Sequence, residues 1–191
     1  MSAIEEVEVR PALSHEEYLR ALKLRVEVFV EEQGGPLEDE PDCWDPAARH
    51  FVALRDGEIV GTARFYQPCL GVGKIGRVAV RREARGQGLG RQLLETMIGH
   101  ARSLGLREIR LDSQVSVIGF YERLGLQSEG GPFMEAGILH QSMRLTLRGD
   151  HVEPGSPDTS GSSRTGSDGG PRSSLSDRAR PSSSVPGSLQ R

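Results

Sequence analysis

The sequence predicts an α+β domain with a mixed, mainly antiparallel central sheet flanked by helices. Three observations support this fold class. Asp56-Gly57 separates two strand-like runs, 50–54 and 59–65, and this dipeptide is a strong signal for a tight antiparallel hairpin. A strand expected over 74–80 ends in a glycine-rich turn that opens an amphipathic helix. A strand at 108–111 then completes a right-handed crossover, so these last two strands should be parallel.

The N-terminal part of the domain is expected to form a short strand, Val7 to Arg10, and a long helix. The helix should begin at Ser14, because Ser14-His15-Glu16-Glu17 has the pattern of a capping box, with Leu13 and Tyr18 placed for the hydrophobic staple. It should stop at Gly34-Gly35-Pro36. The apolar positions at helical spacing are Leu19, Leu22, Val26, Phe29 and Val30.

The segment from Leu37 to Ala48 is irregular and acidic around Trp44. Two interpretations stay open: a negative rim that attracts a cationic amine, or a solvated loop held down by one tryptophan. The acidic residues concerned are Glu38, Asp39, Glu40, Asp42 and Asp45.

The second half of the domain is expected to contain two helices and a final strand. One helix carries an apolar face from Leu89 to Leu104, with Gly105 as its C-terminal cap. Ser116 could cap a short helix that ends at Gly125, and 138–147 contains a strand with apolar residues at alternate positions.

Composition narrows the classes of partner. The 191 residues carry a formal net charge of −3, which disfavours nucleic acid as a partner. No apolar stretch approaches the roughly 18 residues of a membrane span, and the first residues are acidic where a signal peptide is basic, so we expect a cytoplasmic protein. Cys43 and Cys69 form no CxxC pair, so neither a metal site nor a disulfide is expected.

The domain boundary is expected at a sharp change in composition. Residues 149–191 are rich in Ser, Gly, Pro and Arg and contain no aromatic residue. Such a segment cannot offset its own ordering entropy, so we expect a disordered tail. The folded part is then a single domain, residues 1–148.

The glycine-rich turn is a candidate anion site. A strand that ends at a helix N-terminus presents unpaired backbone N–H groups and the positive end of the helix dipole, which suits a diphosphate. The segment Gly86-Gln87-Gly88-Leu89-Gly90 is not GxGxxG and contains no GK[ST], so dinucleotide and nucleoside triphosphate sites are not favoured.

These residues also resemble a known family. Arg85-x-x-Gly88-x-Gly90, preceded by the strand Val78-Ala79-Val80 and followed by an LL-containing helix, resembles the acetyl-CoA-binding motif of the GNAT superfamily of N-acetyltransferases. Residues 120–126, FYERLGL, resemble the FYxxxGF segment of that fold. Residues 28–33 and 133–140 resemble segments of its ElaA-like branch. The resemblance covers nearly all of 7–147 and implies a GNAT-like fold.

The resemblance also implies acetyl-CoA as co-substrate and a set of residues that bind it. The turn would hold the pyrophosphate, and the strand before it, splayed from its neighbour, would pair with pantetheine through its backbone. The Val80 amide would polarise the thioester carbonyl. The sequence departs from the usual family pattern at Arg82, often proline, and at Val117, often alanine. The implied cofactor-binding residues are Val78, Ala79, Val80, Arg85, Gly86, Gln87, Gly88, Leu89, Gly90 and Arg91.

Tyr121 is the catalytic candidate, because the matching tyrosine of many members donates to the coenzyme A sulfur; a core tyrosine is the alternative interpretation. We expect direct attack by a primary amine of a small molecule or peptide. The base stays open among Glu32, Glu38, Glu40, His140 and a water chain.

Two other functions fit the sequence. One is a non-catalytic acyl-CoA-binding regulatory module that has kept the pyrophosphate turn. The other is an enzyme with a longer acyl donor, as in acyl-homoserine lactone synthases. The fold does not identify the acceptor, and a homodimer is the prior expectation for an enzyme of this size.

Overall fold

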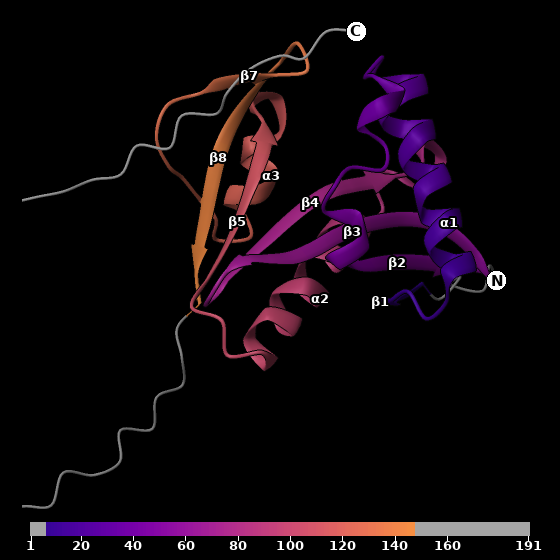
Figure 1. Ribbon diagram of the computed structural model, residues 1–191, viewed down its shortest axis with the longest axis horizontal. Helices are drawn as coiled ribbons and strands as arrows, with labels where there is room; N and C mark the ends of the chain where they lie inside the picture. The colour runs from indigo at the N-terminus through magenta and orange to yellow at the C-terminus, as the bar shows by residue number, and fades with distance from the viewer. Residues whose placement is uncertain (1–6, 148–191) are drawn as a thin grey trace, which may run out of the picture. The chain divides into compact units, whose positions relative to one another are not determined.

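The computed structural model describes residues 7–147, which form a central sheet with helices on both faces (Figure 1). The expected tail, 149–191, lies outside the described residues. The strands are β1 Glu8–Pro11, β2 Arg49–Arg55, β3 Glu58–Cys69, β4 Val72–Val80, β5 Glu108–Gln114, β6 Gln127–Ser128, β7 Phe133–Glu135 and β8 Ile138–Thr146. The α-helices are α1 His15–Arg25, α2 Leu89–Ser103 and α3 Ile118–Glu122.

The order of the strands confirms the predicted fold class. The order across the sheet is β1-β2-β3-β4-β5-β8-β6, and β7 pairs with β8. The pairing of β4 with β5 is parallel, and the other pairings in this part of the chain are antiparallel. The β2–β3 turn confirms the predicted hairpin, since Asp56 and Gly57 both have positive φ, 51° and 77°, as a type I′ turn requires.

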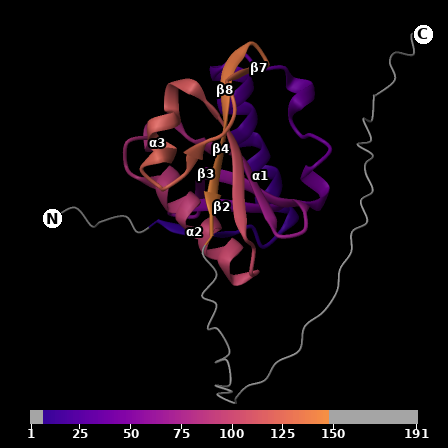
Figure 2. The same cartoon turned by 90° about the vertical axis from the view of Figure 1, so that its left-hand side faces the viewer.

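Strand β2 shows how the core is divided between the two faces of the sheet. Phe51 and Ala53 pack in the cluster that contains the apolar face of α2, whereas Val52 and Leu54 pack with α1. Successive side chains of a strand point to opposite faces, so α1 and α2 cover opposite sides of the sheet. Figure 2 shows α1 on one side and α2 with α3 on the other.

The strands β4 and β5 separate soon after they meet. They pair only over Val72–Lys74 and Glu108–Arg110, whereas β5 pairs with β8 along its whole length. Beyond Lys74, β4 continues toward α1 and β5 stays with β8 (Figure 1). The sheet is therefore open between its two halves, as the family resemblance implied.

The first helix begins as predicted but continues differently. Ser14 is its N-cap, and the Ser14 Oγ accepts a hydrogen bond of 3.1 Å from the Glu17 N–H. Leu13 is 75% exposed, so the predicted staple buries little of it. The α-helical part ends at Arg25, and a π-helical segment, Val26–Glu32, replaces the second half of the predicted helix.

The buried face of this helix is also not the predicted one. The buried apolar residues are Ala21, Leu24 and Val28, whereas Leu19 is 49% exposed. Arg25 lies on the buried face and is only 1% exposed, because its carboxylate partners lie beneath it. Hydrophobic spacing alone could not indicate that an arginine faces inward.

The two later helices differ in how closely they follow the sequence. Helix α2 has the predicted apolar face, and Gly105 follows it at φ 67°, as a C-terminal cap requires. Helix α3 begins at Ile118 with no side-chain cap, after the 3₁₀ turn Val115–Val117. The predicted cap at Ser116 is therefore wrong, since the turn before the helix moves the N-cap position by one residue, to Val117.

Candidate active site

The glycine-rich turn presents a row of free backbone donors. Gly86 and Gly88 have φ of 76° and 81°, in the left-handed region. Within residues 7–147, none of the backbone N–H groups from Gly86 to Arg91 has a hydrogen-bond acceptor. A Cβ at Gly86 or Gly88 would meet no atom within 4 Å, so their outer faces are open. Six free donors at the start of α2 fit a diphosphate.

Two arginines beside this turn hold the carboxylate of Glu32. The Arg85 guanidinium donates to Glu32 Oε2 at 2.8 Å and to the Val80 carbonyl at 2.8 Å. Arg82 lies 3.5 Å from the same carboxylate. The hydrogen bond from Arg85 lowers the pKa of Glu32. The end of the π-helical segment is thus tied to the turn.

The edge of β4 that faces β5 carries the backbone groups of Val78 and Val80. The Arg81 N–H donates to the Val60 carbonyl of β3 at 2.9 Å. Backbone groups alternate in direction along a strand, so those of Val80 point to the other edge, toward β5. The side chain of Ala79 is buried against α1, and that of Leu89 lies in the core on the other face.

A cavity of about 470 Å³ lies in the opening between β4 and β5. Val78, Leu111, Val117 and Tyr121 are among the residues that line it. Tyr121 is 9% exposed, and its hydroxyl has no hydrogen-bond partner within residues 7–147. Burial raises the pKa of Tyr121 to about 12. The cavity therefore joins the free edge of β4 to a buried, protonated hydroxyl.

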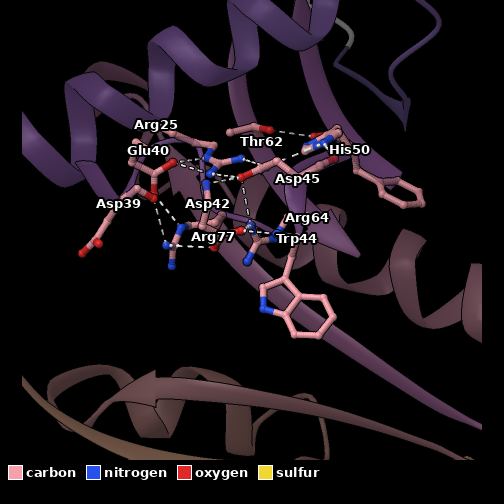
Figure 3. Close-up of polar contacts among 11 residues, drawn as sticks. Arg25, Asp39, Glu40, Asp42, Trp44, Asp45, His50, Thr62, Arg64 and Arg77 are labelled. Carbon is pink, nitrogen blue, oxygen red and sulfur yellow. Dashed lines mark hydrogen bonds and ion pairs between the residues drawn. The ribbon is translucent and has the colours of Figure 1, made fainter. Parts of the chain in front are cut away.

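The acidic loop forms part of the opposite wall through an arginine–carboxylate cluster, which comprises Arg25, Glu40, Asp42, Asp45, Arg64 and Arg77 (Figure 3). Arg25, from α1, contacts both Glu40 and Asp45. Arg64, from β3, donates to Asp42 at 2.5 Å and to Asp45 at 3.0 Å. Arg77 has φ 51° in β4 and lies 2.5 Å from Glu40 and 3.2 Å from Asp42. Three arginines thus face three carboxylates.

Burial and ion pairing oppose each other in this cluster. Burial by itself would raise the pKa of Asp45, but the hydrogen bonds and charge of Arg25 outweigh it and hold that pKa at about 2. At Glu40 burial prevails over Arg25 and raises the pKa. Burial also lowers the pKa of His50, whose Nε2 lies 3.1 Å from the Asp45 carbonyl. The cluster is a structural support for the cavity wall.

Neither interpretation of the acidic loop describes it fully. Glu40 and Asp45 are 8% and 4% exposed and paired, so they are neither solvated nor a free rim. Trp44 is 44% exposed and stacks on Tyr66 of β3, with ring centroids 4.7 Å apart. The arginines that neutralise the loop come from α1, β3 and β4, so the loop sequence alone could not show the pairing.

The candidate bases are placed differently. Glu32 is held by Arg85 and Glu38 is exposed, and neither lines the cavity. Glu40 lines the cavity but is paired within the cluster. His140 also lines the cavity, and its Nδ1 lies 2.9 Å from the Ile138 carbonyl. With Nδ1–H donating to that carbonyl, Nε2 is left as an acceptor.

Among residues 7–147, no group of three His, Cys, Asp or Glu side chains could hold a metal ion. No helix between these limits is long and apolar enough to cross a membrane. Cys43 and Cys69 are exposed free thiols.

Comparisons with known proteins agree with this geometry. The sequence profile of the Acetyltransferase (GNAT) family matches residues 17–126. The uncharacterized N-acetyltransferase YjcF of Bacillus subtilis is 31% identical over 134 residues, which are 69% of this chain and 94% of that protein.

Two solved structures extend the likeness to the fold. An acyl-CoA N-acyltransferase from Pseudomonas aeruginosa is 34% identical, with a TM-score of 0.65 over 73% of this chain and 97% of that one. Escherichia coli ElaA is 28% identical, with a TM-score of 0.66 over 73% of this chain and 99% of that one.

Proposed function

Because the chain belongs to the acetyltransferase (GNAT) family, we propose that it transfers the acetyl group of acetyl-CoA to a primary amine of a small molecule or peptide by direct attack. The observation that carries this proposal is the continuity of the site. Val78, on the edge of β4 that faces β5, and Tyr121 line the same cavity, and β4 leads through Val80 to the free backbone donors of the turn.

The turn would hold the pyrophosphate of acetyl-CoA. The N–H groups of residues 86–91 supply hydrogen bonds, and the start of α2 adds the positive end of its dipole. Arg85 directly precedes Gly86 and would exchange Glu32 for the diphosphate. Arg91 is directed elsewhere in this structure, since it pairs with Glu95 at 2.8 Å. Val78 and Val80 would pair through their backbone with the pantetheine arm.

Acetyl-CoA supplies the reaction with an activated thioester carbonyl. The Val80 N–H would polarise that carbonyl, the amine nitrogen would form the new C–N bond, and the C–S bond would break with release of a thiolate. A thiol has a pKa near 8.5, so complete proton transfer from Tyr121 at about 12 is uphill. We assign Tyr121 the role of a hydrogen-bond donor that stabilises the developing thiolate.

The amine must lose a proton before or during its attack, since a lysine-like amine has a pKa near 10.4. Of the four candidate side chains, His140 fits this role best. It lines the cavity, it has no ion pair within residues 7–147, and the bond of Nδ1 to the Ile138 carbonyl leaves Nε2 free to accept. A His140→Gln variant is expected to lose about 10- to 100-fold in kcat.

Thiol release from acetyl-CoA tests the reaction class. Polyamines, amino acids, aminoglycosides and lysine peptides are supplied as a pool, and amine-dependent release is the expected result. Tyr121→Phe should then lower kcat by about 10- to 100-fold with unchanged acetyl-CoA affinity. Tyr18→Phe is the matched control, because Tyr18 packs against His50, with the two rings tilted by 52°, and does not line the cavity.

The possible outcomes separate the parts of the proposal. Full turnover by Tyr121→Phe would contradict the role of that residue. Tight acetyl-CoA binding without release by any amine would favour a binding module. Absence of both binding and release would contradict the assignment of the turn.

A further inference from the structure

One part of the cavity wall has an excess of negative charge. It is formed by the acidic loop, by β7 and by polar residues of β3, β4 and β5. Of the residues that the structure describes, five acidic and three basic side chains line the cavity. All three basic side chains are already paired: Arg64 and Arg77 in the arginine–carboxylate cluster, and Lys74 with Asp112 at 2.5 Å. An anionic group on a substrate would therefore find no free cation on this wall among residues 7–147.

Two of the acidic side chains are left over. Asp39 ends the 3₁₀ turn Leu37–Asp39, and Glu135 ends β7, so they reach the cavity from different parts of the chain. Both are exposed, and neither carboxylate has a cationic partner within residues 7–147. Arg77 contacts Asp39 only through the Asp39 backbone carbonyl, at 3.2 Å. Figure 3 shows the Asp39 carboxylate turned away from the cluster.

An aromatic surface lines the same cavity as these carboxylates. Trp44 and Tyr66 stack at an interplanar angle of 20°, and the Arg64 guanidinium carbon lies 5.4 Å from the centroid of the Tyr66 ring. Trp44 keeps 44% of its surface exposed in the cavity wall. An exposed indole face attracts an ammonium or guanidinium group.

The cavity also contains a polar group without a hydrogen-bond partner among residues 7–147, the Tyr121 hydroxyl. The Tyr121 hydroxyl, on a side chain that is 9% exposed, lines the same space and has no acceptor within residues 7–147. The reacting end of a ligand would therefore lie at Tyr121. The excess negative charge comes from the acidic loop and β7.

We propose that the acceptor is an amine that carries a second positive charge, which Asp39, Glu135 and Trp44 bind while the reacting amine faces Tyr121. This inference rests on the proposed acetyl transfer and specifies its substrate class. Two unpaired carboxylates and an indole face select a dication over a monoamine, and they repel an amine whose far end is a carboxylate. The binding of the second charge is independent of the chemical step.

Trp44 is the only tryptophan of the chain, so its fluorescence reports ligands in this cavity without turnover. The full chain with coenzyme A is titrated with 1,4-diaminobutane, 1-aminobutane and 4-aminobutanoate, which differ only at the far end. The diamine is expected to bind about 10-fold more tightly than the monoamine and more tightly still than the amino acid. Raising the salt to 0.5 M should reduce this preference.

Variants assign the preference to the two carboxylates. Asp39→Asn and Glu135→Gln should each weaken diamine binding about 3- to 10-fold and leave 1-aminobutane unchanged. Glu38→Gln is the matched control, since Glu38 is adjacent in the loop but does not line the cavity. Thiol release with the same three amines should show the preference in KM rather than kcat.

The inference is overturned if the three ligands bind equally, if the amino acid binds most tightly, or if none changes the fluorescence. It is also overturned if Glu38→Gln has the same effect as Asp39→Asn. A diamine preference in binding without thiol release would contradict the proposed acetyl transfer and leave the assignment of the dication site standing.

Discussion

Replacing Asp45 by asparagine tests how far the arginine–carboxylate cluster stabilises the fold. Asp45 is 4% exposed and accepts hydrogen bonds from Arg25, from Arg64 at 3.0 Å and from the Asp42 N–H at 2.8 Å. Its pKa falls from 3.8 to about 2 on folding. At 1.36 kcal/mol per pKa unit, this shift corresponds to roughly 2.5 kcal/mol of stability at neutral pH.

The expected loss for Asp45→Asn is therefore about 3 kcal/mol, at the lower end of the range for breaking a buried ion pair, because Arg25 keeps Glu40 and Arg64 keeps Asp42. The measurement is the free energy of unfolding in urea. Asp56→Asn makes the same chemical change in the exposed β2–β3 turn and should stay within about 0.5 kcal/mol of the parent.

The stability that Asp45 contributes should depend on pH in a defined direction. Because folding lowers the pKa of Asp45, its stabilisation is present above the unfolded value of 3.8 and is lost as the pH falls through about 2. The difference between parent and Asp45→Asn should shrink to roughly half by pH 3. Equal stabilities at pH 7, or a difference unchanged between pH 7 and pH 3, would refute this account of the cluster.

Three further predictions concern the cofactor site. Gly88→Ala forces alanine to φ 81° and should weaken acetyl-CoA binding, measured by calorimetry, about tenfold. The control Gly90→Ala lies in the helix and should change this affinity by no more than about twofold. Similar losses of affinity in the two variants would contradict the role of the turn. Glu32→Gln frees Arg85 and should tighten the same binding about 3- to 10-fold, so unchanged affinity would show that no exchange occurs. The pH profile of kcat/KM should rise toward pH 9 as the amine deprotonates, and ionisation of Tyr121 should cause no decrease below pH 10. A decrease in kcat/KM below pH 10 that Tyr121→Phe abolishes would contradict the raised pKa of Tyr121.

The sequence predicted correctly the elements whose conformation is determined by residues close together in the chain. The Asp56-Gly57 turn, the N-cap at Ser14 and the apolar face of α2 are each determined by residues within a few positions of one another. The glycine turn belongs to the same group, because its positive φ values and free donors follow from Gly86 and Gly88 themselves. These features are therefore visible in the sequence alone.

The cavity wall depends on distant residues and could not be predicted in this way. Arg25 of α1 is 20 residues from Asp45, and Arg64 and Arg77 come from β3 and β4. The burial of Arg25 changes the expected inward face of the first helix, and the three arginines together neutralise three of the five carboxylates of the acidic loop. Glu135 was not a candidate site residue, since nothing in its sequence neighbourhood indicates that β7 reaches the cavity.

The early separation of β4 from β5 creates two strand edges inside the molecule. Free edges at the outside of a sheet recruit strands from other chains and promote aggregation. Here each edge is recessed, because the strands still pair at Lys74 and Arg110 and α1 and α2 lie on either face. A polypeptide strand with side chains on both faces would meet these helices, whereas a slender, unbranched amide chain can lie along β4. Under the proposed function, this recessed edge of β4 would stay open to the pantetheine arm and closed to strands of other chains.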